Sequence, residues 1–190
     1  MSEIIKKLIE DSLESKKAIF NIIPEIEKSA ELLRLSLKDG NKILICGNGG
    51  SASQSQHFAA ELVGRFEAER KGISCISLTV DTSNITAIAN DYGFEFIFSK
   101  QIEALGREGD VLIALSTSGN SKNIIKAIEE SRAKNMKIIN LIGKDGGKMK
   151  GMADIDLIVP DKNTARIQEG HILVLHILAK LVEDAFLTTN

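Results

Sequence analysis

The sequence predicts an α/β fold in which a parallel sheet is covered on both faces by helices. Short apolar runs alternate along the chain with segments of helical period, which is the order found in parallel α/β proteins. The runs are almost continuously apolar, which is typical of strands buried on both faces. Five such strands are expected, at Lys42–Cys46, Ser74–Leu78, Val111–Leu115, Lys137–Ile142 and Ile155–Val159.

Helices are expected both before and after the first strand. Apolar residues from Ile4 to Leu13 repeat at helical spacing, and Pro24 favours the start of a second helix that ends at Asp39 and Gly40. The later helices are expected at Ser53–Phe66, Ser83–Asn90, Phe96–Leu105, Ser121–Lys134 and about Thr164–Ala185.

The composition is typical of an enzyme of the cytoplasm. The 190 residues suffice for one domain with a substantial core, and 43% hydrophobic with 26% charged residues is ordinary for a globular protein. A formal net charge of −2 gives no basic field, so no nucleic-acid partner is expected. The N-terminus has no continuous apolar run, so neither a signal peptide nor a membrane partner is expected. Cys46 and Cys75 fall in apolar runs, where buried reduced thiols are expected.

A glycine-rich turn after the first strand has the properties of an anion site. Gly47, Gly49 and Gly50 allow a sharp turn and close approach of a ligand to the backbone. Ser51 and Ser53 offer hydroxyl groups and are expected to cap the start of the following helix. A helix N-terminus presents unpaired N–H groups and partial positive charge, so this turn can hold a phosphate without a lysine.

A second polar turn follows the third strand. It reads Ser116-Thr117-Ser118-Gly119-Asn120-Ser121 and opens the next helix. Ligands of doubly wound sheets bind outside the carboxyl ends of the strands, so both turns are expected to face one crevice. The four hydroxyl groups favour a phosphate cradle; the alternative is a polar turn that only caps a helix.

The first turn also approaches the dinucleotide fingerprint, as Gly47-x-Gly49-x-x-Ala52, with Asp81 as the acidic residue that would bind a ribose. Asp81 is farther from the turn than the usual spacing of about 20 residues, and a dinucleotide leaves the second turn without a role. No nucleotide cofactor is therefore expected.

His57 and Glu61 are candidates for acid–base chemistry. They stand at positions i and i+4, so they share one face of the helix that follows the first turn. Glu61 lies among apolar residues, where burial would raise its pKa toward that of a useful acid or base. On the last helix, Gln168 lines up with an apolar stripe and His176 lies about 80° from it. This geometry indicates that His176 is a core or interface histidine. Periodicity alone does not decide whether His171 or His176 acts as a ligand.

Several segments together resemble the sugar-isomerase (SIS) domain family over nearly the whole chain. They are CGNGGSASQSQHFAAELVGRF, NDYGF, GREGDVLIALSTSGNS, GKDGGKM and ARIQEGHILVLHIL. The resemblance implies a three-layer, flavodoxin-like α/β/α sandwich with a five-stranded parallel sheet. It also implies a single domain over residues 1–190, with a helical pair at 1–40, that assembles as a homotetramer. The implied reaction converts D-sedoheptulose 7-phosphate to D-glycero-D-manno-heptose 7-phosphate, the first step toward bacterial surface heptoses.

The resemblance also implies roles for individual residues. The catalytic pair falls on Glu61 and His176, and some members of the family hold zinc with residues matching His57, Glu61, Gln168 and His176. The substrate and phosphate positions fall on Asn48, Gly49, Gly50, Ser51, Arg65, Asp91, Ser116, Thr117, Ser118, Ser121 and Gln168. Ala165 departs from the family pattern, because an aspartate often stands there. A contact to a substrate hydroxyl is therefore expected to be missing or to come from another group.

Two other functional classes share this fold. Some relatives bind the bacterial replication initiator as adaptors without catalysis, but that subgroup lacks the residues matching Glu61 and His176, which this chain keeps. Sugar-phosphate-sensing transcription regulators carry a DNA-binding domain ahead of the SIS domain, and two helices within about forty residues do not supply one. The sequence therefore favours an isomerase.

Overall fold

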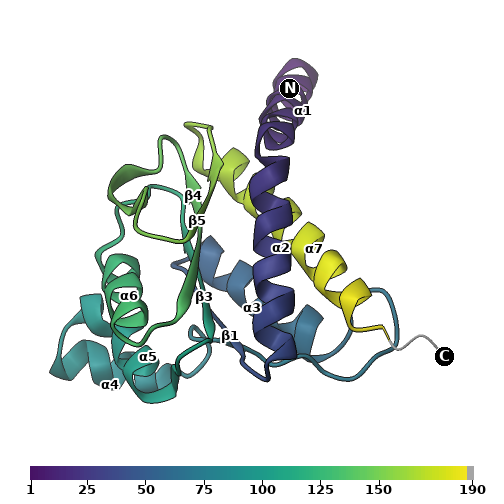
Figure 1. The fold of residues 1–190 in the computed structure, drawn as a ribbon. Helices are drawn as coiled ribbons and strands as arrows, with labels where there is room; N and C mark the ends of the chain where they lie inside the picture. The colour runs from purple at the N-terminus through teal and green to yellow at the C-terminus, as the bar shows by residue number, and fades with distance from the viewer. Residues whose placement is uncertain (188–190) are drawn as a thin grey trace.

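The computed structural model describes residues 1–187 and contains a five-stranded parallel sheet with the strand order β2-β1-β3-β4-β5 (Figure 1). All five strands lie where the sequence predicted them, within one or two residues at each end. Their bounds are β1 Ile43–Cys46, β2 Cys75–Ser77, β3 Val111–Ser116, β4 Lys137–Gly143 and β5 Ile155–Val159. The predicted α/β fold with a five-stranded parallel sheet is confirmed.

Seven α-helices surround the sheet within the described residues. They are α1 Ser2–Lys17, α2 Ile23–Lys38, α3 Gly50–Val63, α4 Thr82–Asp91, α5 Ser99–Leu105, α6 Lys122–Ala133 and α7 Thr164–Ala185, with 3-10 turns at Ala18–Ile22, Phe94–Phe96 and Gly147–Met149. The expected helix at Phe96–Leu105 is thus divided between a 3-10 turn and α5. Asp81, considered above as a ribose ligand, caps α4 by accepting a hydrogen bond from the N–H of Asn84 at 2.9 Å.

The sequence prediction for the start of α3 was wrong in one respect. The helix begins at Gly50, and its N-cap is Gly49, which provides no side-chain cap. Ser51 and Ser53 therefore lie inside the first turn, and the Ser53 hydroxyl donates to the carbonyl of Gly50 at 2.7 Å. The reason is that Gly49 adopts a φ of 55°, a left-handed conformation that lets the chain enter the helix three residues early.

Each face of the sheet carries its own hydrophobic core. Along β1, Ile43 and Ile45 pack on the face covered by α2, α3 and α7, whereas Leu44 and Cys46 pack on the face of α5 and α6. Strands covered on both sides have no polar face, which explains why they are continuously apolar. Figure 1 shows the resulting layers, with α2 and α7 on one side of the sheet and α4, α5 and α6 on the other.

Helix α1 extends away from this body (Figure 1). Two contacts join its residues to α7: Arg166 donates to the carbonyl of Leu8 at 2.6 Å, and Ser12 donates to Glu169 at 2.5 Å. Its apolar side chains from Ile4 to Leu13 are about half exposed or more. None of the helices in residues 1–187 combines the length and apolar character needed to cross a bilayer.

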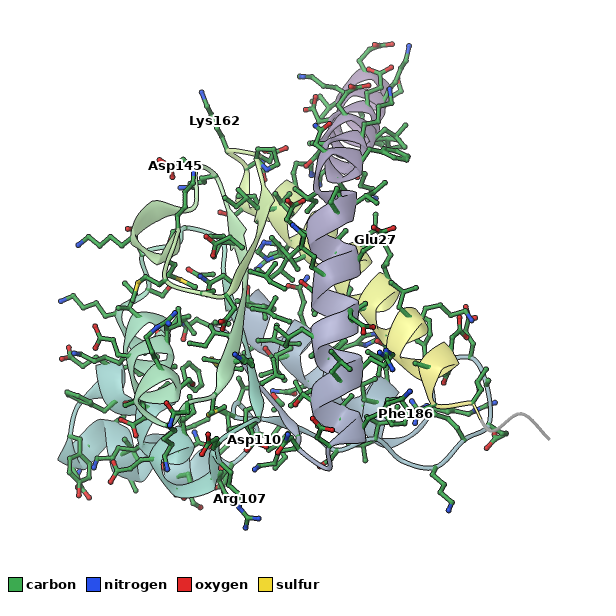
Figure 2. All side chains as sticks on the ribbon, viewed as in Figure 1. Glu27, Arg107, Asp110, Asp145, Lys162 and Phe186 are labelled. Carbon is green, nitrogen blue, oxygen red and sulfur yellow. The ribbon has the colours of Figure 1, made fainter. Side chains whose placement is uncertain are left out.

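A buried carboxylate joins strands at the amino edge of the sheet. Asp110, 1% exposed, accepts hydrogen bonds from the backbone N–H groups of Lys42 and Arg107 at 2.9 and 2.8 Å and pairs with the Lys42 ammonium. Figure 2 shows Asp110 and Arg107 together at this edge, with Asp145 and Lys162 at the opposite, carboxyl edge.

We expect Asp110→Asn to lower the free energy of unfolding by about 3 kcal/mol, because it leaves Lys42 without its partner and replaces one acceptor by an N–H₂ donor. Urea unfolding followed by circular dichroism measures this loss. Glu10→Gln, which removes only the exposed 3.9 Å pair with Lys6, provides the control and should leave the unfolding midpoint unchanged. Equal midpoints for all three proteins would contradict a stabilising role for Asp110.

Candidate active site

The turn between β1 and α3 has glycines at positions where a side chain would not fit. A Cβ atom on Gly47 would lie 2.7 Å from Ser51, and one on Gly50 would collide with the side-chain amide of Gln168. Ser51 is 3% exposed, and the chain enters α3 with the N–H of Ser51 bonded to the carbonyl of Asn48 at 3.0 Å. The turn therefore has the tight geometry of an anion-binding helix start, and it contains the predicted positions Asn48, Gly49, Gly50 and Ser51.

The turn between β3 and α6 gathers three hydroxyl groups. Ser116 Oγ lies 3.1 Å from Ser121 Oγ and 3.5 Å from Ser118 Oγ. Ser121 is the N-cap residue of α6, yet its side chain makes no capping hydrogen bond. Thr117, between these serines, is half-buried. A turn that served only as a cap would use the Ser121 hydroxyl on the helix, whereas here that hydroxyl bonds to Ser116 Oγ within the turn.

The two turns are joined by a pair of side-chain amides. Asn48 Nδ2 donates to Asn123 Oδ1 at 2.9 Å, and Asn123 Nδ2 donates back to Asn48 Oδ1 at 2.8 Å. Asn123, in the first turn of α6, is 3% exposed. Asn123 was not among the residues predicted from the sequence, although a buried asparagine next to a polar turn needs partners of its own. This pair confirms that the two turns lie side by side at the carboxyl edge of the sheet.

The β3–α6 turn also rests directly on the turn that follows β4. A Cβ on Gly119 would collide with the carbonyl of Gly146, and one on Gly147 would lie 2.6 Å from the carbonyl of Ser118. Gly119 accepts a hydrogen bond from the N–H of Met149 at 3.0 Å. The hydroxyl-bearing turn is therefore supported by backbone packed against backbone.

Helices α3 and α7 bring three polar side chains together. His57 Nε2 lies 3.0 Å from Glu61 Oε1 and 3.2 Å from His176 Nε2, and His176 Nε2 lies 3.4 Å from the same Glu61 oxygen. The i, i+4 spacing predicted for His57 and Glu61 is confirmed. Glu61 Oε2 is buried and has no hydrogen-bond partner within residues 1–187. One carboxylate oxygen is thus held by two imidazoles while the other remains free for chemistry.

This cluster is farther from the glycine turn than the sequence suggested. At 1.5 Å per residue, Gly50 and Glu61 are about 16 Å apart along the axis of α3. The His57 and Glu61 side chains of α3 meet His176 of α7. The turn and the carboxylate therefore occupy opposite ends of one helix.

The structure also distinguishes the two histidines of α7. His171 is fully buried and neither ring nitrogen has a hydrogen-bond partner among the described residues; burial lowers its pKa to about 4. The His176 side chain is 39% exposed and meets Glu61. Burial raises the pKa of the Glu61 carboxyl, and the charges of His176 and His57 partly oppose that rise. His176 is therefore the imidazole available to Glu61.

Phe66, another residue that the sequence analysis did not select, lies against His176. The two rings are stacked, with centroids 5.9 Å apart and an angle of 28° between their planes. Phe66 follows the end of α3 in the loop that leads to β2. One face of the His176 imidazole is therefore covered by an apolar ring.

The residues His57, Glu61 and His176 have the geometry of a metal site. Their ligand atoms all lie within 4.8 Å of one another. A tetrahedral zinc ion with bonds of 2.0–2.1 Å places its ligand atoms about 3.3 Å apart, which is close to the three distances given above. The Glu61 carboxylate and the two imidazoles also match the oxygen and nitrogen ligands that zinc accepts. The donor set therefore fits a metal ion.

Three other predicted site residues and Ala165 lie outside the cluster of His57, Glu61 and His176. Gln168 lies over the backbone of Gly50, two turns of α7 before His176. Arg65 is exposed just beyond α3 and pairs with Glu69 at 3.2 Å. Asp91 is exposed at the end of α4 and accepts a hydrogen bond from Asn90 at 2.8 Å. Ala165 is exposed in the first turn of α7, where Asn163 provides the cap.

Comparison with known proteins assigns the family. A model of the SIS domain matches residues 9–143. The phosphoheptose isomerase of Helicobacter hepaticus is 53% identical over 184 residues, which are 97% of this chain and 94% of that protein. The phosphoheptose isomerase of Campylobacter jejuni, serotype O:6, is 55% identical over 162 residues, 85% of this chain and 87% of that protein.

A solved structure gives the same result in three dimensions. Phosphoheptose isomerase GmhA from Neisseria gonorrhoeae superimposes with a TM-score of 0.92 at 43% identity, over 96% of this chain and 98% of that chain. Sequence and fold thus agree along nearly the full length. The chain belongs to the SIS domain family and, within it, to the phosphoheptose isomerases.

Proposed function

We propose that this protein interconverts a ketose and an aldose phosphate, converting D-sedoheptulose 7-phosphate to D-glycero-D-manno-heptose 7-phosphate through a cis-enediol. Membership of the phosphoheptose isomerases gives the reaction class. The observation that carries the mechanism is the Glu61 carboxylate, with one oxygen held by His57 and His176 and the other buried and unpartnered. A buried carboxylate with a raised pKa is a stronger base than a solvated one.

In this mechanism, Glu61 removes the proton from C1 of the ketose while His176 gives a proton to the carbonyl oxygen at C2. The electron pair of the broken C–H bond forms the C1–C2 double bond of the enediol. Glu61 then returns its proton to C2, and His176 takes the proton of the C1 hydroxyl as the C1 carbonyl forms. Both groups finish in their starting protonation states, so one residue moves the carbon-bound proton and the other moves the oxygen-bound protons.

We further propose zinc as the ion, with His57, Glu61 and His176 of one chain as ligands. Gln168 lies about 12 Å before His176 along α7, so it would join this ligand set only from a second copy of the chain. Held by these residues, a zinc ion would supply Lewis-acid polarisation of the substrate carbonyl. Glutamine is a weak zinc ligand, so the affinity should be modest. A carboxylate bound tightly to metal is a weaker base, and we therefore assign the proton transfer to Glu61 with metal in a supporting role.

For the phosphate group, we propose the hydroxyls of Ser116, Thr117, Ser118 and Ser121 together with the N-terminus of α6. The Ser121 hydroxyl supports this assignment, because it contacts Ser116 Oγ in the turn and makes no capping bond to α6. Asn48, Gly49, Gly50 and Ser51 would contact the sugar next to the phosphate, with Gln168 close by. The exposed Arg65 and Asp91 remain substrate positions by family resemblance alone.

We propose a homotetramer as the working form. The apolar side chains of α1 are exposed, with Ile4 at 66% and Ile9 at 57%, and a neighbouring groove of about 320 Å³ is mostly apolar. The groove is lined by Lys16, Ile19, Phe20, Ile23, Ile26, Glu27, Leu173, Ile177 and Leu181. The separation of about 16 Å between Gly50 and Glu61 gives assembly a further role, because a second copy can supply one end of the site.

We place the activity in the cytoplasm as a single domain over residues 1–190. Cys46 and Cys75 are free, buried thiols, and burial raises the pKa of both, as fits unreactive cysteines in a reducing compartment. The adaptor function described above is the alternative, and the retained Glu61–His176 contact argues against it.

We expect Glu61→Gln and His176→Gln each to lower kcat by at least about 10²-fold, since each removes a general acid–base group while keeping a similar shape. A coupled assay with D-sedoheptulose 7-phosphate measures the rates, and circular dichroism verifies folding. Glu31→Gln, which removes an exposed pair with Arg34 on α2, is the control. Near-normal turnover in either folded variant would remove that residue from the mechanism.

We expect the double variant Ser118→Ala and Ser121→Ala to raise KM by one to several orders of magnitude, because each lost hydrogen bond to a charged ligand is worth about 1.5–3 kcal/mol. The value of kcat should fall less if ground and transition states share the lost contacts. Thr86→Ala removes an exposed hydroxyl of α4 and is the control. Unchanged KM, or equal turnover of the unphosphorylated sugar by the wild type, would mean that the turn is only a helix cap.

We expect one zinc ion per chain to bind the demetallated protein and His57→Ala to weaken that binding at least about 10-fold, because a direct ligand is lost. Zinc titration with elemental analysis measures both quantities. Gln168→Ala should weaken binding less than His57→Ala. Tight stoichiometric zinc in His57→Ala would show that the ligand set is different.

A further inference from the structure

A second buried carboxylate lies on α7 beyond the reactive cluster. Glu183 is fully buried and about two turns after His176. Its Oε1 accepts a hydrogen bond from the N–H of Phe66 at 2.9 Å, and its Oε2 accepts from Glu67 and Ala68 at 2.9 and 3.0 Å. Glu183 thereby holds three consecutive backbone amides of the loop that follows α3. The first of these residues is Phe66, whose ring lies on His176.

A buried guanidinium holds the other side of the same loop. The Arg70 side chain is fully buried, and its Nε lies 3.3 Å from Glu183 Oε1 in an ion pair without hydrogen-bond geometry. Its Nη2 donates to the carbonyl of Glu61 at 2.7 Å, and its Nη1 donates to the carbonyls of Leu62 and Gly64 at 2.8 and 3.1 Å. These are carbonyls at the end of α3, which a helix leaves unpaired. Arg70 therefore caps the turn that carries Glu61.

We propose that Glu183 and Arg70 act as a positioning pair for the isomerase reaction, in which Arg70 fixes the turn of α3 that bears Glu61 and Glu183 fixes Phe66 against the His176 ring. This inference rests on the function proposed above. Neither residue touches Glu61 or His176 side-chain atoms through a hydrogen bond, so each acts through another group. Glu61 and His176 come from different helices. Glu183 and Arg70 join those two helices through the loop between Gly64 and Ala68.

The contacts are more specific than general stabilisation requires. An ion pair that only filled the core would not need this division of hydrogen bonds. Arg70 bonds to the carbonyls at the end of α3, and Glu183 bonds to the loop that lies beside α7. The charge of Glu183 is stabilised by its immediate neighbours. Burial raises the pKa of Glu183, but the three N–H groups and Arg70 outweigh that effect, so the pKa is lowered overall. Glu183 thus stays ionised as an acceptor. Small displacements of reacting groups are costly, because a misplacement of about 1 Å can reduce a rate about 10²-fold.

The test compares two buried carboxylates of the same kind. Glu183→Gln keeps the size of the side chain but turns one acceptor into a donor that faces backbone N–H groups. Asp110→Asn makes the same change in a carboxylate that also accepts backbone N–H groups and pairs with a cation, but whose partners lie outside α3 and α7. Both variants should unfold at a lower temperature than the wild type. Steady-state rates with D-sedoheptulose 7-phosphate are then corrected for the folded fraction of each protein.

We expect Glu183→Gln to lower kcat about 10-fold or more with KM changed less than about threefold, because the phosphate turn lies on other elements. Asp110→Asn should keep kcat within about twofold of the wild type. Arg70→Lys, which keeps the charge and loses the planar fork, should resemble Glu183→Gln. An unchanged kcat in folded Glu183→Gln, or an equal loss in Asp110→Asn, would overturn the positioning role.

A second readout, taken at a temperature where Glu183→Gln is folded, does not depend on turnover. The chain has three histidines, so the ring signals of His176 can be assigned in histidine-labelled protein by comparison with His176→Gln. Removing only the stacked ring in Phe66→Leu should shift the His176 signals, and Glu183→Gln should shift them in the same sense. If the wild type fails to isomerise the sugar phosphate, the proposed function is wrong, and these spectra still decide the positioning. Unshifted His176 signals in Glu183→Gln would refute it.

Discussion

The parallel packing of α3 against α7 is the constraint on which the reactive groups depend. Each helix follows a strand of the same parallel sheet, so both return in the same direction across one face. Their contacts then follow sequence order: the Gln54 side chain donates to the backbone carbonyl of Gln168, the His57 ring meets the His176 ring, and the backbone N–H of Phe66 donates to Glu183. A shift of one turn between the helices would separate all of these pairs at once.

Much of this arrangement could be predicted from the sequence, because local spacing determines it. The strands followed from apolar runs, and the shared face of His57 and Glu61 followed from the helical period. The choice between His171 and His176 could not be made in this way, because it depends on how α7 is rotated about its axis when it packs. The early start of α3 was missed because Gly49 replaces a side-chain cap by its own backbone conformation.

Glu61 and Glu183 lie on neighbouring helices, and their pKa values shift in opposite directions because their surroundings differ. Burial raises the pKa of Glu61, and its second oxygen has no donor to stabilise the charge. Glu183 is buried more completely, yet three N–H groups and a guanidinium lower its pKa. The negative charge of Glu183 adds to the rise in the pKa of Glu61. Glu183 is detectable in the sequence as an acid on the apolar face of a long helix, but its partners are contributed by a loop with no regular period.

The contact between Gly119 and Gly146 has a thermodynamic consequence for ligand binding. The hydroxyl-bearing turn lies against another backbone segment with no side chain between them, so neither segment has rotamers to lose there. A flexible loop that closes on a ligand has to be ordered at the moment of binding, and that ordering weakens the observed affinity. Here the ordering entropy has already been lost during folding. If the turn binds phosphate as proposed, the hydrogen-bond enthalpy of the bound phosphate would therefore be retained largely as affinity.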